Sequence, residues 1–100
     1  WNNGGMFQSA NSFNQDIGNW DVSNVTDMGS MFSDASDFNQ DIGTWDVSNV
    51  TDMNSLFLWA SSFNQDLTQW CVSQFTTMPG NFSPSSALTA SNHPVWGTCP

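Results

Sequence analysis

Apolar and polar positions recur along this chain with a period of 25 residues. Residues 13–16, 38–41 and 63–66 all read Phe-Asn-Gln-Asp, and residues 21–28 return without change at 46–53. Self-similarity at a fixed spacing is the signature of repeat architectures, in which each unit buries its apolar face against its neighbours. We therefore expect the units to stack along one axis with a shared core, which includes Trp20, Trp45, Trp70, Met28 and Met53.

Each unit combines two shorter periodicities. One is the spacing of apolar residues on a helix face, i, i+3, i+4, i+7, found at Met28, Met31, Phe32 and Ala35. The other is the alternation of a short strand, found in the segments Trp20–Val22, Trp45–Val47 and Trp70–Val72. The sequence thus predicts an α/β repeat, a right-handed solenoid similar to leucine-rich repeats, with short parallel strands and short helices.

The period ends near Met78, which divides the chain into two parts. Residues 1–78 form the predicted solenoid, with a partial first coil at 1–25 and further coils at 26–50 and 51–75. Residues 79–100 break the pattern with turn residues such as Pro79 and Pro84, and we expect them to form a C-terminal cap. The first coil starts partway into a repeat, so we expect either earlier repeats or another molecule to cover its end, at Trp1, Met6 and Phe7.

The unit F-N-Q-D-I-G-x-W-D-V-S-N-V-T-D-M resembles the repeats of BspA-like leucine-rich-repeat surface proteins. The resemblance covers residues 4–78. The closing stretch, from residues 70–72 to residues 94–100, is similar to the C-terminal cap that follows such arrays. It implies a secreted protein displayed at the cell surface, with a role in adhesion or surface structure, and it supplies no catalytic motif.

Two cysteines lie at the end of the array. Cys71 occupies a position that is Asp in the other units, and Cys99 is the penultimate residue. We expect a disulfide that pins the tail across the last coil, with two free thiols as the alternative. A disulfide would indicate an oxidising compartment, in agreement with an extracellular location.

The charge composition excludes several classes of partner. The chain has nine acidic residues and no Lys or Arg, which gives a formal net charge of −9. Nucleic-acid binding and attraction to anionic lipids both need cationic side chains, so we expect neither. No apolar run is long enough to insert into a membrane as a helix.

Stacked side chains provide the remaining candidate sites. Asp16, Asp41 and Asp66 share one column, in which their carboxylates repel one another. A structural Ca²⁺ ion bound between the units could offset this repulsion, and hydrogen bonding to backbone N–H groups or free solvation are the alternatives. No other cofactor is expected. Three sequons are possible glycosylation sites, at Asn24, Asn49 and Asn81. The concave outer strand face is a candidate partner surface, comprising Asn19, Asp21, Ser23, Thr44, Asp46 and Ser48.

Two functional hypotheses follow, neither of them enzymatic. In the first, the protein is a structural element that self-associates head-to-tail into an extracellular filament, because a heterologous contact that does not close generates an open assembly. In the second, it is an adhesin-type module whose concave face binds a host protein or glycan.

Overall fold

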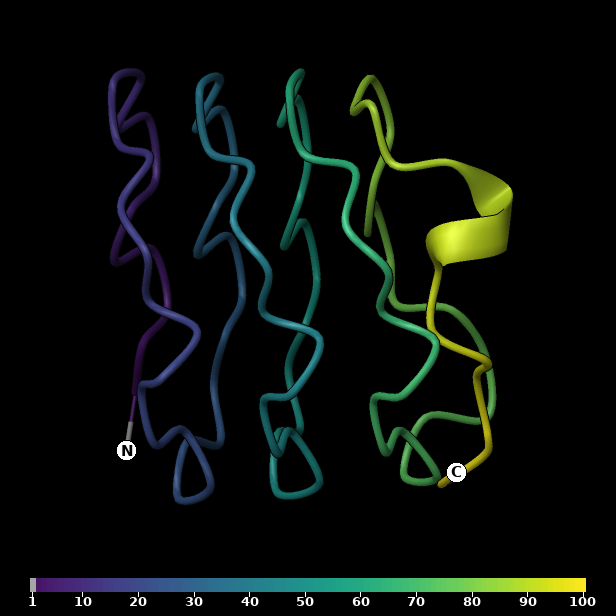
Figure 1. Cartoon of the computed structure of the whole chain (residues 1–100). Coiled ribbons are helices and arrows are strands. Elements are labelled where there is room, and N and C mark those ends of the chain that lie inside the picture. Colours follow the sequence, from purple (N-terminus) through teal and green to yellow (C-terminus); the bar gives the residue numbers. More distant parts are fainter. Residues whose placement is uncertain (1) are drawn as a thin grey trace.

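A computed structural model describes residues 2–100 and shows a stack of similar loops (Figure 1). We call residues 2–25 the first loop, 26–50 the second loop, 51–75 the third loop and 79–100 the C-terminal segment. The three loops lie side by side, and the C-terminal segment lies against the third (Figure 1). Trp1, expected at the assembly end, lies outside the described residues.

The prediction of an α/β repeat solenoid is wrong. In the described part of the chain there is no α-helix and no strand. The one regular element is the short 3-10 helix η1 (Ala90–Asn92). Strand-like pairing between the described loops consists of two isolated parallel bridges, which join Asn2 with Asp27 and Asp27 with Asp52. The short parallel strands and short helices expected in each unit are therefore absent, and turns and irregular backbone replace them.

The segment expected to be helical is a run of consecutive β-turns. The N–H of Met31 donates to the carbonyl of Met28 at 3.1 Å, and Ser33 and Ala35 donate to carbonyls three residues before them in the same way. Ser30 and Asp34 have positive φ angles of 58°, which a right-handed helix excludes. Every second N–H is also used elsewhere, because Ser30 and Phe32 donate to the next loop. A run of turns thus satisfies the apolar spacing that indicated a helix.

The segments expected to be strands lie between turns. Trp45 N–H donates to the Ile42 carbonyl and Val50 N–H donates to the Val47 carbonyl, each at 3.1 Å. Because a turn closes immediately on each side, the stretch Trp45–Val47 makes no ladder with its neighbours. Its alternation still directs Trp45 and Val47 inward, where both are buried, and leaves Asp46 exposed.

Two columns of phenyl rings run along the stack. Phe32 lies 5.7 Å from both Phe7 and Phe57 by ring centroids, and Phe38 lies 5.7 Å from Phe63 in the second column. Within the second loop the two columns touch, with the rings of Phe32 and Phe38 stacked at 4.2 Å. Burying one such side chain stabilises a fold by about 1.5–3 kcal/mol. This core takes the place of a helix–sheet interface.

The C-terminal segment is fixed to the third loop along its whole length. Its first part accepts hydrogen bonds at Gly80, Phe82 and Pro84. Its return path meets the other side of that loop, where Leu67 and Val72 donate to the carbonyls of Asn92 and Thr98. Cys71 and Cys99 form a disulfide, with their Cα atoms 4.0 Å apart, which confirms the expected pairing. The third loop is thus covered on its far side.

Candidate functional site

Hydrogen bonding between loops has a fixed direction on one side of the stack. Ser30, Phe32 and Asp34 of the second loop donate their N–H groups to the carbonyls of Asn54, Leu56 and Leu58 in the third loop, at 2.7–3.0 Å. The first loop donates to the second through its equivalent residues Gly5, Phe7 and Ser9. On this side of the stack, each loop therefore presents carbonyl oxygens toward the loop before it and N–H groups toward the loop after it, whereas Thr51 N–H donates in the opposite direction to the carbonyl of Thr26.

The first loop ends this pattern with an unfilled row of acceptors. The carbonyls of Gly4, Met6 and Gln8 occupy the positions of acceptors used in later loops, but no N–H among the described residues donates to them. We call these three carbonyls the head edge. A row of unpaired backbone groups on an outer segment is a template for pairing with another chain.

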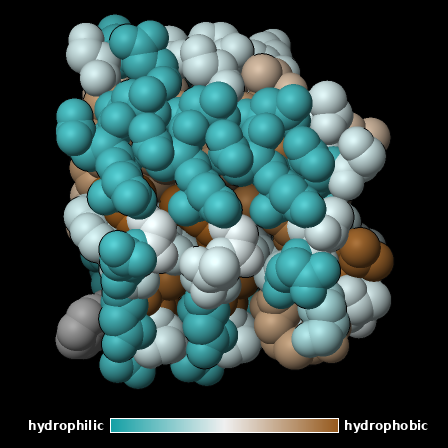
Figure 2. Space-filling view, in the orientation of Figure 1, coloured by the Kyte–Doolittle hydropathy of each residue, from teal (hydrophilic) through white to brown (hydrophobic). Residues whose placement is uncertain are grey.

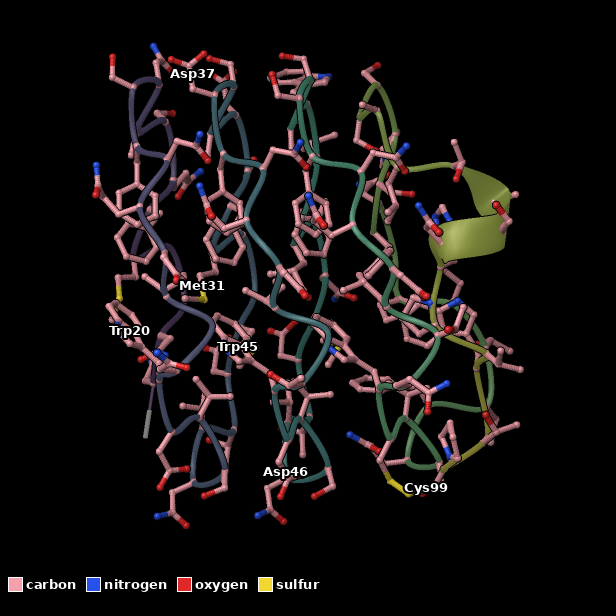
Figure 3. The ribbon with its side chains drawn as sticks, in the orientation of Figure 1. Trp20, Met31, Asp37, Trp45, Asp46 and Cys99 are labelled. Atoms are coloured by element: carbon pink, nitrogen blue, oxygen red, sulfur yellow. A yellow bond between two sulfur atoms is a disulfide. The ribbon has the colours of Figure 1, made fainter. Side chains whose placement is uncertain are left out.

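The tryptophans of the three loops also differ between the first loop and the later loops, both in exposure and in the hydrogen bonding of the indole N–H. Trp45 is 4% exposed and its indole N–H donates to the carbonyl of Ile17 in the first loop, and Trp70 does the same to Ile42 of the second loop. Trp20, at the equivalent position, is 43% exposed, and it lies at the outer side of the stack (Figure 3). Trp20 therefore differs from the expectation that it lies in the core. Its indole N–H has no acceptor among residues 2–100.

Other apolar side chains of the first loop are also open to solvent. Met6 is 48% exposed, whereas its equivalent Met31 is fully buried. Phe7 and Phe13, the first rings of the two phenyl columns, are half-buried, in contrast to the fully buried rings of later loops. The first loop thus has the side chains of an inner loop, and within residues 2–100 no further loop covers them.

The candidate Ca²⁺ column is engaged in local turns. One carboxylate oxygen of Asp16 accepts the N–H of Gly18, and Asp41 and Asp66 accept from Gly43 and Thr68, at 2.8–3.0 Å. The Thr68 hydroxyl also donates to Asp66 and, together with the backbone N–H, lowers the pKa of that carboxyl below its ordinary value. Across residues 2–100 no group of three or more His, Cys, Asp or Glu side chains could hold a metal ion.

The six residues of the candidate partner face are exposed or half-exposed, and Asp46 lies at the lower side of the stack and points outward (Figure 3). Because residues 2–100 form no sheet, these residues do not form a concave strand face. The hydroxyl of Ser48 donates to Asp46 at 2.6 Å, and this bond, followed by the Ser48 backbone N–H, lowers the pKa of the carboxyl. Ser23 does the same to Asp21. Figure 2 shows how polar side chains gather in rows across this view of the molecule.

The three candidate glycosylation sites have different surroundings. The amide of Asn49 donates to the carbonyl of Ser23 in the preceding loop at 2.7 Å. Asn24 is exposed. Asn81 is exposed and has a positive φ of 53° in the C-terminal segment. Of the three sequon residues, Asn81 is the one in the C-terminal segment, outside the repeats.

His93 joins two parts of the C-terminal segment. One ring nitrogen lies 2.7 Å from the Thr89 carbonyl, and the other lies 2.7 Å from the Ser83 hydroxyl. Its ring also lies beside Phe82. The contact helps to hold the return path of the segment against its first part.

The sequence predicted that earlier repeats or another molecule cover the first loop, which stays a prediction, but it did not predict the direction of the backbone hydrogen bonds. The signal that carries this polarity is the alternation of φ signs at Gly5 and Ser9, which recurs at Ser30 and Asp34. Ser and Asp give little indication of positive φ in a sequence, so the row of outward carbonyls was not predictable from residue types.

The geometry of residues 2–100 defines a class of protein: a stack of turn-rich loops closed at its C-terminal end by a disulfide. Residues 2–96 match a family model described as "Mycoplasma protein of unknown function, DUF285". The chain belongs to this DUF285 family. Comparisons with curated proteins and with solved structures found no match. No helix in the described part of the chain is long and apolar enough to cross a membrane.

Proposed function

We propose that this protein is a non-enzymatic, secreted structural element of the cell surface that assembles head-to-tail into an extracellular filament. The observation that carries the proposal is the difference between Trp20 and Trp45. The same residue is 43% exposed in the first loop and 4% exposed in the second, where a neighbouring loop covers it. The removal of apolar surface of this kind from water is thermodynamically favourable and would therefore stabilise an assembly.

The extracellular setting is supported by two features. The Cys71–Cys99 disulfide is of a kind that persists in oxidising compartments. The repeat also resembles BspA-like surface proteins, which have structural and adhesive roles. The non-enzymatic reading is supported by the acidic side chains, which hold turns: Asp21 binds Ser23, Asp46 binds Ser48 and Asp66 binds Thr68.

The charge of the protein affects how assembly should be tested. Every copy carries a net charge of −9 with no Lys or Arg, so copies repel one another at low ionic strength. The Debye length falls from about 30 Å at 0.01 M salt to about 10 Å at 0.1 M. Association should therefore become stronger as salt is added, which is opposite to an assembly held by ion pairs.

Sedimentation velocity across a range of protein and salt concentrations tests the proposal. The expected result is a mass that rises with both, together with periodic fibres in negative-stain micrographs. Met6→Glu places a charge at the head edge and should weaken association. The matched control Thr44→Glu adds the same charge at an exposed position in the middle of the stack and should change little. A monomer under all conditions would refute the proposal.

The alternative is an adhesin-type module that binds a protein or glycan. A hollow of about 360 Å³ beside the candidate partner face favours it, with a mixed polar and apolar lining of Asp41, Gly43, Thr44, Trp45, Asp66 and Gln69. Binding to a glycan array would then be lost on Thr44→Glu and retained on Met6→Glu, the reverse of the pattern expected for assembly.

A further inference from the structure

A serine and a histidine of the C-terminal segment form a hydrogen-bonded pair. The Oγ atom of Ser83 lies 2.7 Å from Nε2 of His93, and Nδ1 of the same ring lies 2.7 Å from the carbonyl oxygen of Thr89. We infer that the Ser83 hydroxyl is an activated nucleophile that accepts an acyl group from a reactive ester or thioester. This modification site goes beyond the proposed structural function and does not depend on it.

The Thr89 carbonyl determines which nitrogen of His93 carries the proton. A carbonyl oxygen can only accept a hydrogen bond, so Nδ1 is protonated in the neutral ring and donates to it. Nε2 is then unprotonated and accepts the hydroxyl hydrogen of Ser83. A hydroxyl within about 2.6–3.2 Å of a base, which a third group orients in turn, is the arrangement that activates a serine as a nucleophile.

The backbone holds both side chains in place. The two residues that flank Ser83 each accept a backbone hydrogen bond from the third loop, at 2.8 and 3.0 Å. His93 directly follows η1, in the yellow part of the chain in Figure 1, and Thr89 lies at the other end of this short helix. The N–H of Thr89 donates to the side chain of Asn64 in the third loop at 3.0 Å. The pair therefore lies on two segments that are each anchored to the stack.

Ser83 borders a hollow that suits an acyl chain. The hollow has a volume of about 330 Å³ and is lined by Met78, Asn81, Phe82, Ser83 and Pro84. Three of these five side chains are apolar and would contact the chain of the acyl group. Ser83 and His93 are both half-buried, so a reagent can reach them. The backbone N–H groups of Asn81 and Ser83 meet no acceptor among residues 2–100, and are available to the negatively charged oxygen that forms during acyl transfer.

The transfer exchanges one acyl bond for another, with no oxidation or reduction. As Oγ of Ser83 attacks the carbonyl carbon of the donor, its proton moves to Nε2 of His93. A new Oγ–C bond forms, the bond from that carbon to the leaving oxygen or sulfur breaks, and the leaving group takes the proton from His93. The products are an O-acyl serine and an alcohol, phenol or thiol. One acylation per chain requires no turnover, so it is compatible with a non-enzymatic structural element.

Few other side chains of this protein compete for an acyl donor. The chain has no Lys and no Tyr, and its two cysteines are joined in the Cys71–Cys99 disulfide. Serine and threonine hydroxyls are weak nucleophiles unless a base activates them. His93 is the single histidine of the chain, and the hydroxyl beside its Nε2 is that of Ser83. We therefore expect Ser83 to react before the other hydroxyls.

Acylation by p-nitrophenyl octanoate tests the inference. The folded protein should release one equivalent of p-nitrophenol and gain the mass of one octanoyl group. Peptic digestion, chosen because the chain has no Lys or Arg for trypsin, followed by fragmentation should place this group on Ser83. Ser83→Ala should abolish the release, and His93→Gln should slow it by about 100-fold or more. The matched control Ser85→Ala removes a neighbouring exposed hydroxyl and should leave the release unchanged.

A thiol in place of the hydroxyl gives a second readout. Ser83→Cys should react with iodoacetamide at neutral pH at least several-fold faster than Ser85→Cys, because a neighbouring imidazole promotes the reactive thiolate. Exposure alone predicts the opposite order, since Ser85 is exposed and Ser83 is half-buried. Near-ultraviolet circular dichroism and mass analysis without reductant check that every variant keeps its packing and the Cys71–Cys99 disulfide.

The possible failures are distinguishable. Octanoyl groups spread over several serines, or release that is unchanged in Ser83→Ala, would overturn the assignment, and so would alkylation of Ser83→Cys no faster than that of Ser85→Cys. These results leave the proposed assembly untouched, because sedimentation measures it separately. Release that depends on Ser83 but continues past one equivalent would support the nucleophile and overturn the non-enzymatic part of the proposed function.

Discussion

The indole N–H of Trp45 donates a hydrogen bond to the backbone carbonyl of Ile17, at 3.1 Å across the boundary between the second and first loops. Trp70 repeats the bond to Ile42 at 2.9 Å. The carbonyls they satisfy belong to buried residues. These bonds link neighbouring loops through side chains as well as through backbone, and Trp20 has no such acceptor among residues 2–100.

Trp45→Phe should therefore destabilise the protein. It removes the side-chain hydrogen bond to the Ile17 carbonyl, which then keeps only the backbone N–H of Trp20 as a donor; a hydrogen bond of this kind contributes about 0.5–1.5 kcal/mol, and the substitution also removes part of a buried ring system. Trp20→Phe is the matched control and should change the free energy of unfolding by about 0.5 kcal/mol or less, as exposed substitutions do. Urea unfolding followed by circular dichroism measures both. Equal losses for the two variants would contradict the account.

Reduction of the Cys71–Cys99 disulfide should loosen the C-terminal segment. The bond spans 28 residues of sequence, and bonds of this kind stabilise by about 2–4 kcal/mol. The expected result is a fall of that size in the free energy of unfolding for the Cys71→Ser, Cys99→Ser double variant. Proteolysis should then cut first within residues 79–100. Unchanged stability and unchanged cleavage would show that the segment is held by its packing alone.

Gly43→Ala should force neighbouring loops apart. A Cβ at Gly43 would lie 2.6 Å from the backbone carbonyl oxygen of Asp66 in the next loop, and backbone cannot move aside as a flexible side chain can. Overpacking of this kind costs about 1–3 kcal/mol. Gly80→Ala is the control, because its Cβ would meet its nearest neighbour at 3.8 Å. Thermal unfolding should show a lower midpoint for the first variant and little change for the second.

The Ser48 hydroxyl should stabilise the fold in a pH-dependent way. It lowers the pKa of Asp46 in the folded state below its ordinary value of 3.8, so its contribution is present above that pH and is lost as the pH falls through the lower folded-state pKa. Ser48→Ala should therefore be less stable than the parent at neutral pH, and the difference should vanish in acid. Ser73→Ala is the control, since Cys71 replaces the aspartate there. A difference that persists in strong acid would rule out this cause.

The sequence predicted which apolar residues of the repeat lie inside but not the backbone that places them there. Met28, Met31 and Phe32 are all fully buried, as their spacing indicated. The same spacing is met by a chain of turns, because alternate N–H groups bond within the turn and to the next loop. A segment in which φ is positive at every fourth residue, as at Ser30 and Asp34, cannot form a right-handed helix, whatever the helix propensity of its residues.

The candidate site was predicted only in part, for a related reason. Met6 and Phe7 were recognisable as apolar residues of an outer loop, because their equivalents recur in every unit. The outward carbonyls and N–H groups depend on which way each peptide unit faces, and residue identity does not fix that. Trp20 was expected in the core because an inner tryptophan and an outer one have the same sequence surroundings.

Amide hydrogen exchange resolved by residue tests the central claim most directly. In dilute, low-salt solution the N–H of Phe32, paired with Leu56, should be protected, and the N–H of Ser83 should exchange freely. Free exchange at Phe32 in the monomer would contradict the stacked loops.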